Sequence, residues 1–257
     1  IYLKYKIHGI DEKIPVRHIV IDEAQDFSPF QILVIRKIIK DSFFTILGDL
    51  AQGIHSYRGT RDWEEIKEKV FEGKPCELLI LEQSYRTTIE IMNAANSVLN
   101  NMKTRNFPMG KPVIRHGRPV VISEKDNLMD ICNQIRKDMD EIKCEGYKSI
   151  AIICKTLDEC REIYSYLKGS KYKPKLIKGN EKEYDSNIVI LPSYLSKGLE
   201  FDVVFIVDCS QVNYGENEMD IKLLYVAMTR PLHRLYIYYT GEMSPLLQQC
   251  KTQANVL

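Results

Sequence analysis

Several features that would assign this chain to a functional class are missing from its 257 residues. Lys and Arg number 36 against 35 for Asp and Glu, so the net charge of +1 supports neither a strongly basic nucleic-acid wrapper nor an acidic tail. Any site for a polyanion must therefore be a local groove. The longest apolar stretches are strand-sized and interrupted by charge, and the N-terminus lacks a basic segment followed by an apolar one. Neither membrane insertion nor export is indicated.

Metal-binding cysteine patterns are also lacking. The seven cysteines include no C-x-x-C pair and no matching pair of histidines, and several of them lie in apolar runs. We therefore expect reduced core thiols in a cytosolic protein. The composition, 44% hydrophobic and 28% charged, is ordinary for a soluble globular protein, and the length suits two small α/β domains.

Short β-branched runs alternate with helical periodicity along the chain. Strands are predicted at residues 18–22, 43–49, 77–81, 149–154, 187–191, 203–208 and 235–239. Three apolar helix faces lie between them: Trp63, Ile66 and Val70; Leu128, Ile131, Ile135 and Ile142; and Cys160, Ile163 and Leu167. This alternation predicts an α/β fold with parallel sheets and crossover helices.

Local signals place the helix starts and the domain boundary. Capping-box spacing occurs at Thr87 with Glu90 and at Thr156 with Glu159. Residues 101–118 are rich in Pro, Gly and basic side chains, which indicates an irregular connection. The composition of residues 72–75 suits a junction between two sheets, so we expect domains at residues 1–74 and 75–257.

The run from Ile19 to Asp26 puts two adjacent carboxylates, Asp22 and Glu23, at the end of a predicted buried strand. In open α/β sheets ligands sit outside the carboxyl ends of the strands. There an Asp can hold Mg²⁺ while its neighbour acts as the base that positions a water. The alternative is that the two acids cap the helix expected to begin near Ser28.

A second predicted strand end opens into a Gly-bearing loop at residues 48–59. The neutral amide of Gln52 can hydrogen-bond a γ-phosphate, or the water that attacks it, without adding charge. Tyr57 and Arg58 offer a stacking face beside a cation, a pairing that holds single-stranded nucleic acid. The alternative for this pair is a turn with a half-buried Tyr and a solvated Arg.

Two arginines and one Gly-bearing turn complete the set. Arg86 follows a predicted strand end, and Arg230 ends a predicted helix before Pro231. The planar fork of either could neutralise developing phosphoryl charge, although each Arg taken singly is better explained as part of a surface salt bridge. In the turn before the strand at 203–208, Gly198 would let backbone approach a ligand, and Glu200 could accept hydrogen bonds from a ribose hydroxyl or from a basic partner.

These strings, in this order, resemble the UvrD/Rep-like superfamily 1 helicases, whose two RecA-like domains clamp ATP between them. The resemblance spans roughly Arg17 to Tyr239. It implies the following roles: Asp22 for Mg²⁺, Glu23 as catalytic base, Gln52 as γ-phosphate sensor, Arg86 and Arg230 as arginines reaching ATP, Glu200 as ribose contact, and Tyr85 against the adenine. It also implies that Tyr57 stacks on a base of the tracked strand, with Arg58 beside it.

One departure from the family pattern concerns the phosphate-binding loop. The string G-x-x-x-x-G-K-[ST], whose backbone N–H groups and Lys bind triphosphate, is absent. We therefore expect the C-terminal part of a longer protein: an incomplete first RecA-like domain of the P-loop NTPase type, followed by a complete second one. Negligible ATPase activity is expected from this part alone.

A second departure concerns the branch of the family. The stretch from Arg86 to Lys197 is too short for the large inserted domain of UvrD-type helicases, and Tyr194 stands where they usually have a His that helps contact DNA. Both features look more like the HelD branch, relatives of helicase IV whose HelD members act on RNA polymerase.

Three functions are compared. The first is an ATP-dependent translocase or helicase on single-stranded DNA, with 3′ to 5′ polarity carried over from the family. The second is a HelD-like ATPase that dislodges RNA polymerase with little unwinding. The third, a helicase fused to a nuclease as in RecB-like proteins, needs an acidic metal site beyond Arg230, for which residues 241–257 lack room.

Overall fold

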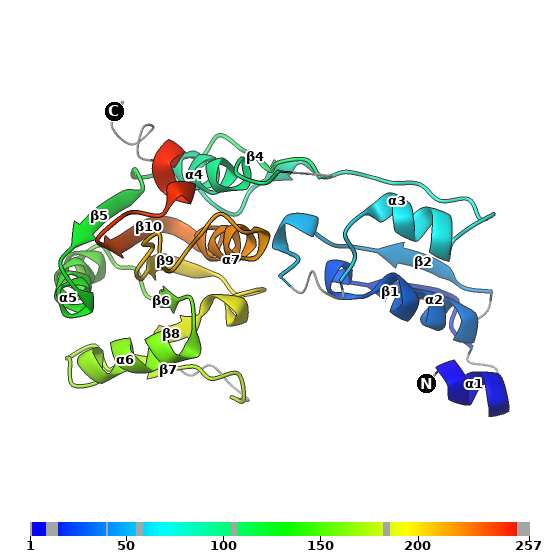
Figure 1. The fold of residues 1–257 in the computed structure, drawn as a ribbon, viewed down its shortest axis with the longest axis horizontal. Helices are drawn as coiled ribbons and strands as arrows, with labels where there is room; N and C mark the ends of the chain where they lie inside the picture. Colours follow the sequence, from blue (N-terminus) through cyan, green and yellow to red (C-terminus); the bar gives the residue numbers. More distant parts are fainter. Residues whose placement is uncertain are drawn as a thin grey trace. The chain divides into compact units, whose positions relative to one another are not determined.

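The computed structural model describes residues 2–8, 15–39, 41–54, 59–103, 107–181 and 186–250, and the chain divides into two compact units, Ile1–Leu81 and Glu82–Leu257 (Figure 1). In both units the paired strands run parallel, which confirms the predicted α/β class. No helix within the described ranges is long and apolar enough to cross a membrane.

Unit 1 is built on a two-stranded sheet. Its elements are α1 (Tyr2–His8), β1 (His18–Ile21), η1 (Ala24–Asp26), α2 (Pro29–Ile38), β2 (Phe43–Ile46), η2 (Leu50–Gln52), α3 (Trp63–Glu65) and the π-helical turn η3 (Ile66–Val70). Helix α2 begins as predicted, because Ser28 and Gln31 form a reciprocal capping box and Pro29 occupies the first turn.

The two faces of the β1–β2 sheet differ in burial. Ile21 packs into a small core with Ile32, Ile66 and other apolar side chains of α2 and η3. On β1 and β2, Val20 and Phe43 are 60% and 78% exposed. Parallel sheets are normally covered on both faces, so these exposed residues are unusual for this class of sheet.

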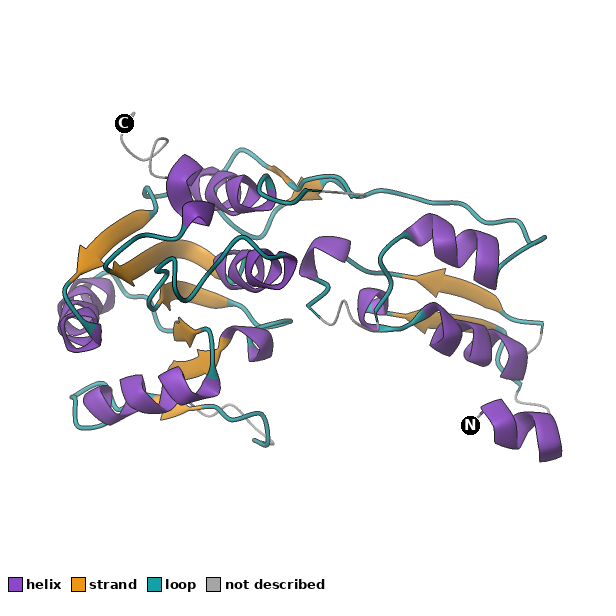
Figure 2. Cartoon of the chain, in the orientation of Figure 1, coloured by secondary structure: helices purple, strands orange, loops and turns teal. Residues whose placement is uncertain are grey.

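Unit 2 contains a six-stranded parallel sheet and a separate two-stranded one (Figure 2). Its elements are β3 (Gln83–Ser84), α4 (Ile89–Leu99), β4 (Lys111–Pro112), β5 (Val121–Lys125), α5 (Leu128–Cys144), β6 (Ile150–Cys154), α6 (Leu157–Leu167), β7 (Lys175–Leu176), β8 (Ile188–Pro192), η4 (Ser193–Leu195), β9 (Phe201–Ile206), α7 (Glu218–Met228), β10 (Pro231–Thr240) and η5 (Pro245–Leu247). The large sheet has the order β5-β10-β9-β6-β8-β7, and β3 pairs with β4.

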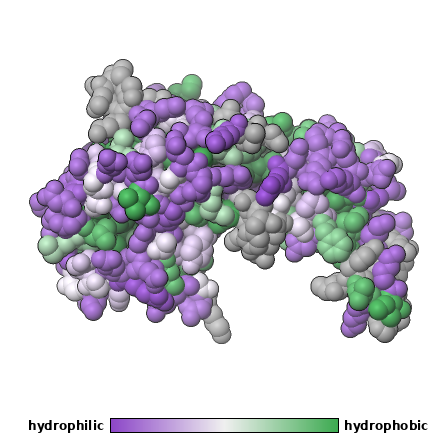
Figure 3. All heavy atoms as spheres, viewed as in Figure 1, coloured by the Kyte–Doolittle hydropathy of each residue, from purple (hydrophilic) through white to green (hydrophobic). Residues whose placement is uncertain are grey.

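Helices cover both faces of the large sheet (Figure 1). Helices α5 and α6 pack together on one face, and α4 and α7 pack together on the other. The predicted apolar faces of α5 and α6 are confirmed, since Ile131, Ile135, Cys160, Ile163 and Leu167 are fully buried. The central strands β6 and β8 are buried along their whole length, as expected where helices lie above and below. On the face visible in Figure 3 the surface is mostly hydrophilic, with hydrophobic patches on each unit.

One predicted strand is wrong. Residues 77–81 have no regular secondary structure, and Leu79 and Leu81 are 75% and 92% exposed. The run has strand-like composition, but no described strand pairs with it, and an isolated apolar run cannot form a ladder by itself. The pairing strand in this region is β3, two residues further on.

Smaller corrections concern edges and caps. Strands β5 and β7 were not predicted, and β4 lies inside the segment expected to be irregular. The N-cap of α4 is Thr88, which accepts from the Ile91 N–H, whereas Thr87 is buried before it. Glu90 instead accepts a hydrogen bond from the Gly117 N–H at 2.8 Å. All seven cysteines are free, but Cys76 and Cys144 are exposed rather than in the core.

Candidate functional site

The predicted acidic pair lies at the carboxyl end of β1. Asp22 and Glu23 are both exposed, and the Glu23 backbone N–H donates to Asp22 Oδ1 at 2.8 Å. Glu23 adopts the left-handed conformation, with φ 51° and ψ 35°. A non-Gly residue in this region costs about 1–2 kcal/mol, and such strain clusters at functional sites. An ordinary helix N-cap has an extended backbone, so the left-handed backbone of Glu23 gives its side chain a different direction. The Glu23 side chain makes no capping hydrogen bond to η1.

A chain of side-chain hydrogen bonds connects this strand end to the end of β2. Gln25 donates from Nε2 to Glu23 Oε2 at 2.6 Å and accepts from the Asp49 N–H at 3.1 Å. Asp49 in turn accepts from Gln52 Nε2 at 2.7 Å and from the Ala51 N–H at 2.9 Å. The predicted base and the predicted γ-phosphate sensor thus belong to one network at the carboxyl edge of the sheet, where ligands of α/β proteins bind.

Among the residues that the structure describes, no group of three or more His, Cys, Asp or Glu side chains is placed to hold a metal ion. A Mg²⁺ ion bound together with a nucleotide needs no such group, because it keeps several waters and uses one or two carboxylates. The exposed Asp22 carboxylate has suitable chemistry for that purpose. Tyr57 and Arg58, the predicted stacking pair, lie outside the described residues.

Two predicted site residues of unit 2 form an ion pair with each other. Arg86 Nε lies 2.7 Å from Glu200 Oε1, with the two side chains 37% and 45% exposed. The Arg86 backbone is held as well, because its carbonyl accepts from Arg115 Nη1 at 3.3 Å, and Arg115 Nη2 lies 2.7 Å from His233 Nδ1. Burial and the neighbouring Arg115 lower the pKa of His233, so the neutral ring accepts through Nδ1.

Arg230 lies near this pair but is completely buried. Its guanidinium donates to Val226 O at 2.9 Å, to Leu199 O at 3.4 Å and to Thr229 Oγ1 at 3.0 Å. Glu200 immediately precedes β9, and Arg230 immediately precedes β10. The structure therefore brings Arg86, Glu200 and Arg230 together around the amino ends of two adjacent strands.

The remaining predicted residues are exposed. Tyr85 is 70% exposed, and its hydroxyl donates to Gln83 Oε1 at 3.0 Å. Gly198 has φ +76°, which favours glycine, and open space where a Cβ would be. Tyr194 is 41% exposed in η4, directly after β8. Strands β8 and β9 both run parallel to β6, so the carboxyl end of β8 and the amino end of β9 lie at opposite ends of the strands. Tyr194, which follows β8, is therefore at the other end from Glu200, which precedes β9.

Helicase family models match both units of this chain. The model of the UvrD/REP helicase N-terminal domain matches residues 10–70, and models of the UvrD-like helicase C-terminal domain match residues 79–181 and 187–238. These matches support the UvrD/Rep superfamily.

Known UvrD-like proteins resemble the chain at modest identity. DNA helicase II of Haemophilus influenzae is 30% identical over 175 residues, covering 63% of this chain and 22% of the relative. ATP-dependent DNA helicase PcrA of Staphylococcus epidermidis is 28% identical over 187 residues, covering 70% and 25%. The crystal structure of the C-terminal domain of a possible DNA helicase from Lactobacillus plantarum WCFS1 is similar with a TM-score of 0.56 and 28% identity, over 66% of this chain and 96% of that chain. The chain spans about a fifth to a quarter of the length of the curated relatives it matches.

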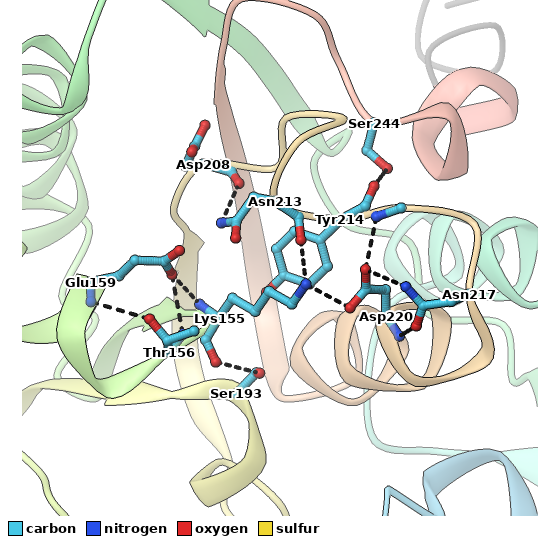
Figure 4. Close-up of polar contacts among 11 residues, drawn as sticks. Lys155, Thr156, Glu159, Ser193, Asp208, Asn213, Tyr214, Asn217, Asp220 and Ser244 are labelled. Atoms are coloured by element: carbon cyan, nitrogen blue, oxygen red, sulfur yellow. Dashed lines mark hydrogen bonds and ion pairs between the residues drawn. The ribbon is translucent and has the colours of Figure 1, made fainter.

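Sequence reasoning missed a buried ion pair at the carboxyl edge of the UvrD-like unit 2 (Figure 4). Lys155 follows β6, and its Nζ lies 2.6 Å from Asp220 Oδ1, donates to Asn213 O and sits 5.3 Å from the centre of the Tyr214 ring. Asp220 also accepts from the Gly215 N–H at 2.8 Å. The available signal was a lone Lys directly after an all-apolar strand.

A neighbouring carboxylate belongs to the same region. Glu159 completes the predicted capping box of α6 by accepting from the N–H groups of Lys155 and Thr156, at 2.8 and 3.1 Å. Burial raises the pKa of Glu159 despite these hydrogen bonds. The carboxylate is thus used to fix the turn after β6, and the turn fixes Lys155.

Proposed function

We propose that the intact protein is an ATP-dependent superfamily 1 DNA helicase or translocase. Two RecA-like domains would close around ATP and move single-stranded DNA between them, in the 3′ to 5′ direction. The observation that carries this proposal is the left-handed Glu23 beside Asp22, joined through Gln25 to the strand end that bears Asp49 and Gln52. The matches to UvrD-like domains and the named DNA helicases support it.

In the nucleotide site, Asp22 would hold Mg²⁺ together with phosphate oxygens. The bound ion would neutralise negative charge on the phosphates. Glu23 would orient the attacking water and accept its proton, and Gln52 would hydrogen-bond the γ-phosphate or that water. The left-handed backbone and the Gln25 amide hold Glu23 in place before any ligand arrives, which is the pre-organisation that such chemistry requires.

Unit 2 would supply the groups that contact the other side of ATP. Arg86 would neutralise phosphate charge and Glu200 would bind the ribose, with Gly198 allowing a close approach and Tyr85 stacking on the adenine. The Arg86–Glu200 pair is more than a third exposed on both sides, so exchanging it for nucleotide contacts costs little. Arg230 would have to exchange its backbone carbonyl partners for phosphate oxygens.

Nucleic acid would contact Tyr57, Arg58 and Tyr194, with Tyr57 stacking on a base of the tracked strand. The aromatic Tyr194, exposed at the carboxyl end of β8, also favours a second candidate function. This is a HelD-like ATPase that binds and recycles RNA polymerase with little unwinding.

An N-terminal part of the same protein would complete the first RecA-like domain and supply the phosphate-binding loop. The exposed Val20 and Phe43 on the β1–β2 sheet support this, because a parallel sheet requires cover on both faces. We accordingly expect residues 1–257 alone to hydrolyse ATP negligibly, and robust Glu23-dependent turnover by this chain would contradict that expectation. The free thiols are in keeping with a reducing, cytosolic location.

The test is ATP hydrolysis by the full-length parent with no addition, with single-stranded DNA and with RNA polymerase. Stimulation by DNA supports the helicase, whereas tight polymerase binding with little DNA stimulation supports the HelD-like function. Glu23→Gln should retain ATP binding and abolish hydrolysis, and Glu64→Gln, which alters an exposed carboxylate on α3, is the matched control. Tyr57→Ala should uncouple hydrolysis from DNA, and loss of Arg230 should slow turnover by ~10³–10⁵.

A further inference from the structure

Gln25 is the least exposed polar residue among the residues of unit 1 that the structure describes. Gln25 is 1% exposed, and its amide contacts Glu23, which follows β1, and Asp49, which follows β2. Its Nε2 donates to Glu23 Oε2 at 2.6 Å, and its Oε1 accepts from the Asp49 N–H at 3.1 Å. A carboxylate can only accept and an N–H can only donate, so the two neighbours together fix which way the amide points.

The backbone of the neighbouring turn packs closely against this side chain. A Cβ at Gly48 would lie 2.4 Å from Gln25 Oε1, and a Cβ at Gly53 would lie 3.6 Å from Gln25 Cγ. The backbone of Gln25 is also held, because its carbonyl accepts from the Thr60 N–H at 3.1 Å. Gln25 is therefore held by hydrogen bonds at both its backbone and its amide, and the lack of a side chain at Gly48 provides the space for the amide.

A neutral donor has a particular effect on Glu23. The Gln25 amide stabilises the carboxylate form without adding a positive charge, and it restrains the side chain of a residue whose backbone is already in the left-handed region. The same amide holds the first residue of the turn that carries Gln52, since Asp49 is the N-cap of η2. A shift of the Glu23 carboxylate would therefore be transmitted through the Gln25 side chain to Asp49 and the turn that carries Gln52.

We infer that Gln25 is a positioning residue that orients the base Glu23 and couples it to the Gln52 turn. The inference rests on the proposed function, because it assigns Gln25 a part in ATP hydrolysis. Gln25 itself touches neither nucleotide nor water in this scheme, and its effect on the reaction passes through Glu23 and Asp49.

Two substitutions in the full-length parent separate the two contacts. Gln25→Glu keeps the size of the side chain and an oxygen for the Asp49 N–H, but loses the donor toward Glu23. Gln25→Met keeps approximate size and loses both contacts. Each should lower DNA-stimulated kcat by 10–100-fold while the KM for ATP changes less than about threefold, as removal of an orienting partner does at other sites. Trp63 is the single Trp of residues 1–257 and borders Gly48, so its fluorescence in this chain carrying the same substitutions checks that unit 1 remains folded.

The separate effects on kcat and KM distinguish positioning from a structural role. A structural role would disturb the whole carboxyl edge of the sheet and raise the KM for ATP along with the loss of kcat. A KM for ATP that rises as much as kcat falls, or an unchanged kcat, overturns the inference. If both Gln25 variants unfold unit 1, Gln25→Asn, whose shortened amide cannot span both partners, replaces them with the same expectations.

Failure of the proposed function gives a different result. If the parent hydrolyses ATP equally well with Glu23→Gln, then Glu23 is not the base and the proposed function is wrong. If Glu23→Gln abolishes hydrolysis but Gln25→Glu and Gln25→Met both retain the wild-type kcat, the proposed function stands and the positioning inference is wrong.

Discussion

Replacing Lys155 by Met should destabilise unit 2 substantially, because it leaves Asp220 as a buried carboxylate without its cation. The Asp220 side chain is 8% exposed and its Oδ1 lies 2.6 Å from Lys155 Nζ. Removing one partner of a fully buried pair costs about 3–5 kcal/mol. Here Lys155 is 22% exposed and Asp220 keeps donors from Gly215 and Asn217, so water and these groups offset part of the loss. We expect a cost of about 2–4 kcal/mol.

Urea unfolding with two probes measures this cost. Far-UV circular dichroism is dominated by unit 2, which holds the six-stranded sheet, whereas fluorescence of Trp63 reports on unit 1. Lys155→Met should shift the dichroism transition and leave the fluorescence transition in place. The double variant with Asp220→Asn should recover part of the loss, because it no longer buries a charge.

The matched control is Lys111→Met, which removes an ammonium group from the exposed pair with Glu82. It should cost less than about 1 kcal/mol. If Lys155→Met lowers the free energy of unfolding no more than Lys111→Met does, burial does not make the Lys155–Asp220 pair more stabilising than an exposed one.

Two further predictions concern other sites. Gly48→Ala would place a Cβ 2.4 Å from Gln25 Oε1 and 2.9 Å from the Trp63 ring, so it should destabilise unit 1 by ~1–3 kcal/mol, and an unchanged Trp63 unfolding midpoint in urea would contradict this. Burial and Arg115 lower the pKa of His233 from its ordinary 6.5. The unfolded chain therefore binds a proton here more readily than the folded protein does. The free energy of unfolding is highest above pH 6.5 and decreases as the pH falls through the pKa of the folded state. His233→Asn, which keeps an acceptor toward Arg115, should flatten the fall in unit 2 stability measured by dichroism, and equal pH dependence in both proteins would argue against the assignment.

The central strands were predictable because their burial is complete. All five residues of β6 are buried, and so are all five of β8, which leaves continuous apolar runs in the sequence. The edge strand β5 reads Val-Ile-Ser-Glu-Lys, half polar and partly exposed, and gave no such signal. The run at residues 77–81 has the composition of a buried strand, but composition alone does not supply the neighbouring strand on which a ladder depends.

The candidate site was predictable only where its residues adjoin in sequence. Asp22 and Glu23 follow one another at the end of an apolar run, so their joint position could be inferred. The link from Gln25 to Asp49 depends on the pairing of β1 with β2, which local sequence does not specify. The ion pair between Arg86 and Glu200 depends likewise on contacts between distant segments, and either residue alone reads as a surface charge.

Under the proposed function, the backbone conformation of Glu23 opposes selection for stability to selection for activity. At φ 51° a Gly or Asn would be tolerated with less strain, so drift in favour of stability should replace the Glu wherever hydrolysis is not required. In a lineage that kept this fold only to bind a partner, we expect Glu at position 23 to be replaced early by a residue such as Gly or Asn. Retention of Glu there, at a lasting cost in folding free energy, is what continued use of the carboxylate would look like.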